Sequence, residues 1–168
     1  MSAVLLLDTN VWSHLLLSET SKRHKVQASL KALVHKYPGA VRATSRVCVA
    51  ECMVAARRLL DPLERAAAEA AFLAEFANLN LMIVEVTDVV ADTAASLRAE
   101  ALRRAALSSG KSASAKGGKL KLPDAIIAAS CLRFDPPAVL VTENAGDFVF
   151  LDGGVQKTVA DIAVERIG

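Results

Sequence analysis

Two short apolar runs, one near each end of the chain, stand apart from the helical periodicity that fills most of the sequence. Residues 3–7 (AVLLL) and 138–142 (AVLVT) show no alternation of apolar and polar positions. Continuous apolar runs of this length predict strands that are buried on both faces, as in a parallel sheet. Residues 41–44 and 79–86 have a similar strand-like composition.

Segments with helical periodicity or capping residues separate these strands. Ser21, Ser45, Asp61 and Thr87 are the residue types that favour helix starts, and Pro38 followed by Gly39 ends one segment. Strands that alternate with helices imply βαβ units and one parallel sheet. The predicted helices cover residues 11–17, 22–37, 46–60, 62–77, 88–107 and 123–133.

Composition narrows the class of protein. A chain of 168 residues predicts a single domain over residues 1–168, with a flexible basic loop at 108–119 (SSGKSASAKGGK). The net charge of +2 is too small to imply a polyanionic partner, so any basic patch must be local. No apolar run approaches the roughly 18 residues of a membrane span. Three cysteines do not form a disulfide framework. We therefore expect a soluble, cytoplasmic protein with no membrane contact.

Two acidic residues occupy unusual places in this pattern. Asp8 follows the first strand, and open α/β sheets place their ligand crevice at the carboxyl ends of the strands. Glu51 is the only charged residue between Val47 and Ala56, so we expect a helix buried nearly all round with one costly carboxylate inside it. The alternatives are an Asp that ends a strand by facing water and a Glu that reaches water past small side chains.

Two further acidic segments lie late in the chain. Asp124 follows Pro123 in the first turn of a helix, and the positions below it on the same face are apolar (Ile127, Ala128 and Cys131). Asn144 and Asp147 follow the strand at 138–142. The alternatives are a helix-capping Asp and an ordinary turn.

The four acidic segments are expected at one edge of one sheet. Clustered carboxylates repel one another unless a cation intervenes, and no Lys or Arg lies within these segments. Oxygen ligands suit Mg²⁺ or Mn²⁺ rather than zinc. The three histidines (His14, His24 and His35) are not spaced as ligands near these acids, and Cys48 with Cys52 lacks two further soft donors.

The ordered set of motifs resembles the PIN-domain ribonucleases, and most closely the VapC toxins of bacterial toxin–antitoxin pairs. The resemblance rests on residues 7–10 (LDTN), 50–51 (AE), 122–125 (LPDA), 140–144 (LVTEN) and 147–148 (DF), and it spans nearly the whole chain. It implies an α/β fold, a three-layer α/β/α sandwich around a parallel sheet of four or five strands. It also implies one or two Mg²⁺ or Mn²⁺ ions held by Asp8, Glu51, Asp124 and an acid of the last loop.

Two departures from the family pattern bear on this expectation. The last motif often reads Thr-x-Asp, and Asn144 stands at that place, so the fourth ligand is either Asp147 or the neutral amide. The loop at 108–119 resembles an insertion relative to a compact toxin. Asn10 and Thr142 are expected to hold the carboxylates or a phosphate by hydrogen bonds.

The function implied is metal-assisted hydrolysis of RNA, with a VapC-type toxin and a stand-alone RNA-processing PIN nuclease as alternatives within it. A non-catalytic RNA- or protein-binding α/β module is the alternative from another class, and a haloacid dehalogenase-like phosphotransferase is disfavoured because Asn10 replaces the second Asp. An antitoxin is expected on apolar residues of the first helix, Trp12, Leu15 and Leu16, together with a homodimer through other helices. The expected RNA-binding residues are Arg103, Arg104, Lys111, Lys116, Lys119 and Lys121.

Overall fold

The structure is a computed structural model that describes residues 3–17, 20–109, 120–148 and 162–167. Five strands form one parallel sheet in the order β3-β2-β1-β4-β5, with β1 at its centre. The strands are β1 (Val4–Leu7), β2 (Val41–Ser45), β3 (Met82–Val84), β4 (Val139–Thr142) and β5 (Val164–Arg166). The expected parallel sheet is therefore confirmed.

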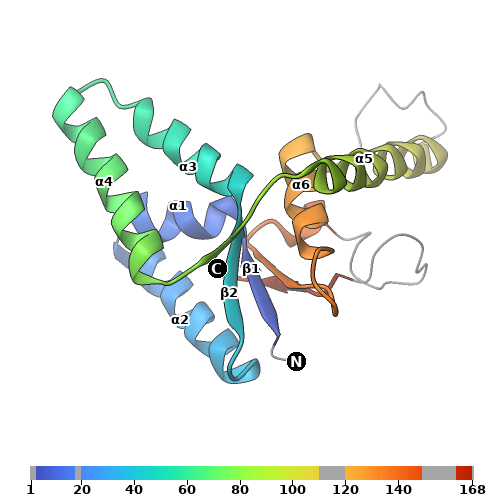
Figure 1. Cartoon of the computed structure of the whole chain (residues 1–168), viewed down its shortest axis with the longest axis horizontal. Coiled ribbons are helices and arrows are strands. Elements are labelled where there is room, and N and C mark those ends of the chain that lie inside the picture. The colour runs from blue at the N-terminus through green and yellow to red at the C-terminus, as the bar shows by residue number, and fades with distance from the viewer. Residues whose placement is uncertain (1–2, 18–19, 110–119, 149–161, 168) are drawn as a thin grey trace.

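Helices cover both faces of this sheet (Figure 1). α1 contacts β4 and α2 on one side, while α6 contacts β2 and β4 and packs against α5 on the other. α3 and α4 form a helical hairpin beside α1. This arrangement confirms the α/β/α sandwich. The helices are α1 (Thr9–Leu17), α2 (Thr20–Lys36), α3 (Arg46–Arg57), α4 (Pro62–Asn78), α5 (Asp88–Ser109) and α6 (Leu122–Cys131), with a 3₁₀ turn η1 (Ala145–Asp147).

The register of the central strands brings their carboxyl ends level with one another. Leu7 is paired with Thr44 of β2 and with Val141 of β4. Leu5, Leu6 and Leu7 are all buried, as their continuous apolar run predicted. The chain therefore leaves β1, β2 and β4 at the same edge of the sheet.

The predicted helix starts are partly correct. Oδ1 of Asp61 accepts hydrogen bonds from the backbone N of Leu63 (2.8 Å) and of Glu64 (2.9 Å), as a helix cap does. The Thr87 hydroxyl accepts from the backbone N of Val90 at 3.4 Å. Ser21 was wrong as a cap, because α2 begins one residue earlier. Ser45 precedes α3, but its Oγ accepts from Ser130 Oγ at 3.0 Å and makes no cap bond.

The fifth strand was not predicted, because two of its three residues (Glu165 and Arg166) are charged. Edge strands of this kind carry no continuous apolar signal. Among the described residues, no helix has both the length and the hydrophobicity needed to cross a bilayer.

Candidate functional site

Asp8 is a buried carboxylate at the carboxyl end of β1, with 5% of its surface exposed. Its backbone N donates to the carbonyl of Val141 at 3.0 Å, which fixes the residue between β1 and β4. The pKa of Asp8 is raised from 3.8 to about 6, mainly by burial and in smaller part by the charges of Asp124 and Glu51, against the lowering effect of its hydrogen bonds. A buried acid with a raised pKa at this edge is typical of a functional site.

A small network of hydrogen bonds orients the Asp8 carboxylate. Oδ2 accepts from the Thr142 hydroxyl (2.6 Å) and from Asn10 Nδ2 (2.7 Å), and Oδ1 accepts from the backbone N of Thr9 (2.6 Å). Asn10 Nδ2 also lies 3.0 Å from Thr142 Oγ1. Asn10 and Thr142 therefore contact the carboxylate they were expected to hold.

Glu51 lies on α3, where its Oε2 accepts a hydrogen bond from the Thr9 hydroxyl. The expectation of a helix buried nearly all round was wrong. α3 buries one face through Cys48, Cys52 and Ala56, whereas Val54 is 57% exposed. Glu51 itself is half-buried. Thr9 was not expected to take part in the site.

Asp124 lies in the first turn of α6, above a buried apolar face as predicted. Burial raises its pKa, and the carboxylates of Asp147 and Glu51 raise it further. Its Oδ2 also accepts from the backbone N of Lys121 at 3.2 Å, so the helix-capping interpretation is correct as well. Asp147, on η1, is therefore close enough for its charge to act on Asp124, whereas Asn144 is exposed and donates its backbone N to Thr142 Oγ1 at 3.0 Å.

The four acids form a chain of electrostatic neighbours, from Asp8 through Glu51 and Asp124 to Asp147. Within the described ranges, none of the four carboxylates has a side-chain nitrogen of Lys, Arg or His within 4 Å, although the charge of Lys121 lowers the pKa of Asp124. The same ranges contain no three His, Cys, Asp or Glu side chains arranged to hold a metal ion. Carboxylate oxygens fit Mg²⁺ or Mn²⁺ in kind. Glu51 and Asp124 accept hydrogen bonds from Thr9 and Lys121, so their side chains would have to rotate before the carboxylates could bind one metal ion together.

His14 lies beside this site, although no role was predicted for it. Its Nε2 contacts Oε2 of Glu143, the residue after Thr142, and Lys22 Nζ lies 3.6 Å from the other oxygen of Glu143. The backbone N of Glu143 donates to Asn10 Oδ1 at 3.0 Å. These contacts join α1, α2 and the end of β4. His14 and Glu143 are 129 residues apart in the sequence, so the spacing of residues along the chain does not predict their contact.

The expected exposure of Trp12 on α1 was wrong. Trp12 is fully buried, packs edge-to-face on Phe76 with ring centroids 5.1 Å apart, and donates Nε1 to Thr44 Oγ1 at 3.1 Å. Leu15 is 6% exposed and Leu16 is partly buried against the core. The hairpin of α3 and α4 supplies the cover that the sequence pattern did not show.

The expected RNA-binding residues lie only partly within the described residues. Arg103 and Arg104 form ion pairs with Glu100, at 2.7 and 2.9 Å. Lys121 is exposed before α6. Lys111, Lys116 and Lys119 lie outside the described residues, as does the loop at 108–119 except for its first two positions.

Comparison with known proteins agrees with this geometry. VapBC2 from Rickettsia felis bound to a promoter DNA fragment is 17% identical, with a TM-score of 0.60 over 98% of this chain and 99% of that chain. FitAcB from Neisseria gonorrhoeae is 22% identical, with a TM-score of 0.61 over 96% of each chain. VapBC-5 from Mycobacterium tuberculosis is 23% identical, with a TM-score of 0.57 over 98% of each chain. At these identities the likeness shows the fold.

No curated protein sequence matches the chain. A family model does match, and its description is "PIN domain". The match runs from residue 5, in the central strand, to residue 145, just after β4, and so includes Asp8, Glu51 and Asp124. The chain therefore belongs to the PIN domain family.

Proposed function

We propose that this chain is a metal-dependent endoribonuclease that hydrolyses RNA phosphodiester bonds and serves as the toxin of a toxin–antitoxin pair. The observation that carries the proposal is the buried carboxylate of Asp8, with its raised pKa and two acidic neighbours but no cationic partner within 4 Å among the described residues. Such a group is costly in the ionised form unless a cation binds to it. Membership of the PIN domain family supports a nuclease.

In this proposal Asp8 and Asp124 bind the metal directly, and Glu51 binds it or orients the attacking water. Thr142 and Asn10 hold the Asp8 carboxylate in place, and Thr9 holds Glu51 through its hydroxyl. Asp147 is the fourth ligand rather than Asn144, because its charge acts on Asp124. Bound Mg²⁺ or Mn²⁺, as one or two ions, supplies a water that is nucleophilic at neutral pH and positive charge at the phosphate.

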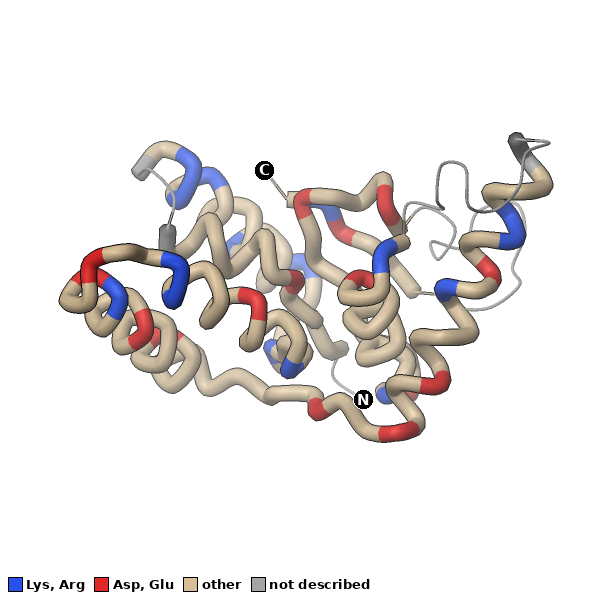
Figure 2. Tube along the Cα trace, turned by 90° about the horizontal axis from the view of Figure 1, so that it is seen from above, with Lys and Arg blue, Asp and Glu red and all other residues tan. Residues whose placement is uncertain are grey.

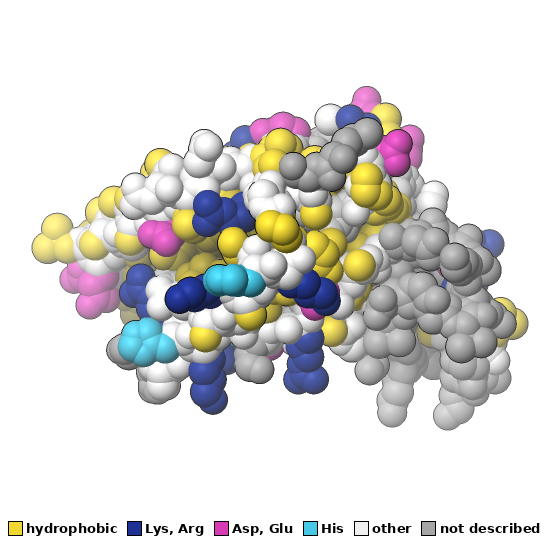
Figure 3. Space-filling view, turned by 90° about the horizontal axis from the view of Figure 1, so that it is seen from below, with side chains coloured by type: hydrophobic (Ala, Val, Ile, Leu, Met, Phe, Trp, Pro, Cys, Tyr) yellow, Lys and Arg dark blue, Asp and Glu magenta, His cyan; other side chains and the backbone are white. Residues whose placement is uncertain are grey.

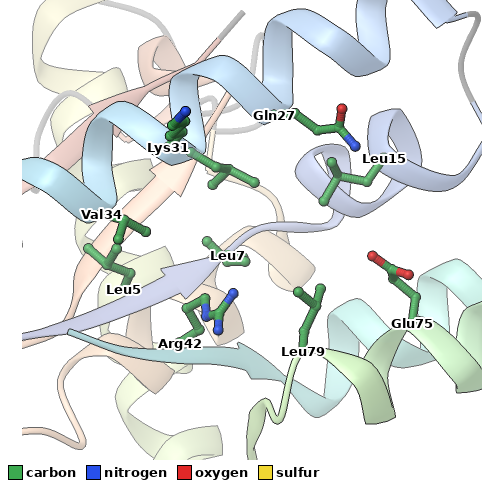
Figure 4. Close-up of a pocket in the computed structure, with 10 residues that line it drawn as sticks. Leu5, Leu7, Leu15, Gln27, Lys31, Val34, Arg42, Glu75 and Leu79 are labelled. Atoms are coloured by element: carbon green, nitrogen blue, oxygen red, sulfur yellow. The ribbon is translucent and has the colours of Figure 1, made fainter. Parts of the chain in front are cut away.

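The partner in this proposal docks in a groove of about 250 Å³ that residues of α1, α2, α4, β1 and β2 line (Figure 4). Apolar side chains dominate the groove, and Val34 at its rim is 48% exposed. Apolar surface of this kind marks interaction sites. A toxin–antitoxin complex from Klebsiella pneumoniae and VapBC-1 from nontypeable Haemophilus influenzae share the fold. This likeness supports an apolar antitoxin segment as the occupant of the groove. The lining residues are Leu5, Leu7, Leu15, Gln27, Leu30, Lys31, Val34, Arg42, Glu75 and Leu79.

A homodimer completes the proposal. Leu60 and Leu63, at the turn between α3 and α4, are 93% and 82% exposed and offer an apolar surface away from the groove. Light scattering of the purified chain tests the dimer. A monomer at all concentrations would contradict it.

The decisive experiment is incubation of the purified chain with total RNA in the presence of Mg²⁺ or Mn²⁺, with EDTA as the metal-free arm. Wild type should cleave, and Asp8→Asn should not. Asp92→Asn, an exposed acid of α5, is the matched control and should cleave like wild type. Growth arrest on expression, relieved by co-expression of the adjacent reading frame, separates a toxin from a stand-alone RNA-processing nuclease. Full cleavage by Asp8→Asn would contradict the assignment.

A further inference from the structure

α2 carries an excess of five positive charges on one element. It contains Lys22, Arg23, Lys25, Lys31 and Lys36 and no Asp or Glu. The whole chain has 20 Lys and Arg against 18 Asp and Glu, so the remaining residues contain three more acids than cations. The tube in Figure 2 is blue along the first turns of α2, just after the short grey gap at 18–19, and α2 has no red segment.

These charges lie on the surface of the molecule. Arg23, Lys25 and Lys31 are exposed, whereas Val26 and Leu33 point into the core. Lys, Arg and His side chains are prominent on the face seen from below, where α2 lies (Figure 3). A helix of 17 residues is about 25 Å long, so the positive charge follows an extended track rather than a point.

Only part of this charge is neutralised by neighbouring acids. Lys22 lies 3.6 Å from Glu143, and Lys36 forms an ion pair with Glu165. In the part of the chain that the structure describes, Arg23, Lys25 and Lys31 have no carboxylate within 4 Å. These three cations are therefore available to a polyanion.

The start of α2 lies next to the acidic site. Lys22 contacts Glu143, the backbone N of Glu143 donates to Asn10 Oδ1, and Asn10 Nδ2 donates to Asp8 Oδ2. Three consecutive contacts thus connect the first turn of α2 with the carboxylate at the centre of the site. A cluster of carboxylates repels phosphates, so a nuclease needs cations beside it to hold the strand.

We propose that the exposed surface of α2, with Arg23, Lys25 and Lys31, binds the phosphate backbone of a single-stranded RNA that leads to the acidic site; Lys31 also lines the groove proposed for the antitoxin. This inference rests on the proposed function. It places the substrate-binding surface on α2, for which the sequence pattern predicted only a helix. Lys and Arg at phosphates release counterions, so each contact adds to the salt dependence of binding. Arg103 and Arg104, which were expected to bind RNA, already pair with Glu100.

The test is fluorescence anisotropy of a short labelled single-stranded RNA, titrated with the full chain in EDTA so that no cleavage occurs. The triple variant R23Q, K25Q, K31Q should bind more weakly than wild type. Its plot of log affinity against log salt should be shallower by about 2, because each contact with a single strand contributes about 0.7 to the slope. The matched control is R57Q, R58Q, R133Q, which removes three exposed cations from other elements and should keep the wild-type slope.

The outcomes separate this inference from the proposed function. Equal slopes for wild type and the α2 variant, or no RNA binding by wild type, would overturn the assignment of α2. Loss of binding to labelled poly-glutamate with unchanged RNA binding would assign α2 to an acidic protein and would also overturn it. Failure of wild type to cleave RNA with Mn²⁺, in the separate activity assay, counts against the proposed function alone.

Discussion

The hydroxyl of Thr142 donates a hydrogen bond of 2.6 Å to Oδ2 of Asp8 across the junction of β4 and β1. This bond lowers the pKa of Asp8, against the larger effect of burial. The Asp8 side chain therefore changes between its neutral and its ionised form at about pH 6. Thr142 is thus a positioning residue that also favours the form able to bind a cation.

Removing that hydroxyl should move the activity to higher pH. Thr142→Val leaves Asp8 with one donor fewer, so its pKa should rise above the present value of about 6. We expect the acidic limb of the pH–rate profile of RNA cleavage to shift upward. Thr142→Ser retains the donor and should restore the wild-type limb. Identical limbs for Thr142→Val and wild type would show that the hydroxyl does not act on Asp8.

Stability without metal should fall as the pH rises through the range in which Asp8 ionises. The pKa of Asp8 is about 6 in the folded chain against the ordinary value of 3.8, so between these pH values the folded state holds a proton that the unfolded state has lost. The stabilising contribution is complete below pH 3.8 and lost above about 6. Over this window, wild type should lose about 3 kcal/mol relative to Asp8→Asn.

Urea unfolding in EDTA at several pH values measures this difference. Asp92→Asn, on the exposed side of α5, is the control, and its difference from wild type should be flat with pH. A flat difference for Asp8→Asn would mean that the folded carboxylate titrates as it does in the unfolded chain.

Asp147 and Asn144 can be compared directly as the fourth ligand. The charge of Asp147 acts on Asp124, so Asp147→Asn should weaken Mn²⁺ binding more than Asn144→Ala does. Isothermal titration calorimetry of the two variants gives the answer. A larger loss for Asn144→Ala would make the amide the ligand instead.

Trp12 should behave as a core residue rather than as a contact for a partner. Its ring packs on Phe76 and is fully buried, so Trp12→Ala should cost about 3–5 kcal/mol of stability. The emission of wild type should be blue-shifted and poorly quenched by iodide. Red-shifted emission with free quenching would place the ring at the surface.

The groove beside α2 should accept the partner. Val34→Asp places a charge at its apolar rim, and we expect it to weaken binding of the adjacent-frame protein at least tenfold and to prevent relief of growth arrest. Val89→Asp, at an exposed valine of α5, is the matched control and should bind like wild type. Equal binding by the two variants would put the partner on another surface.

Local patterns were sufficient for the central strands and for the acidic residues proposed as the site. Leu5, Leu6 and Leu7 belong to a continuous apolar run, which predicts a strand buried on both faces. Asp8 follows this run directly. Asp124 was recognisable because Ile127 and its neighbours formed an apolar face below it. Such signals lie within a few residues and need no knowledge of the fold.

Features that depend on distant contacts could not be predicted in this way. Trp12 looked exposed because its cover, Phe76, belongs to a hairpin far along the chain. The contact between His14 and Glu143 spans 129 residues. Thr9 was seen only as part of a motif, whereas the structure shows its hydroxyl bonded to Glu51. These are properties of the packing of helices on the sheet, which periodicity does not encode.

The central position of β1 also sets the order in which the site can form during synthesis. β1 leaves the ribosome first and can pair with β2 as soon as Ser45 has emerged. Its other neighbour, β4, follows almost a hundred residues after β2, and the bond from Thr142 to Asp8 closes over 134 positions. A nascent or truncated chain that stops before α6 therefore lacks both Asp124 and Thr142. The acidic site is therefore complete only after α6 and β4 have been translated.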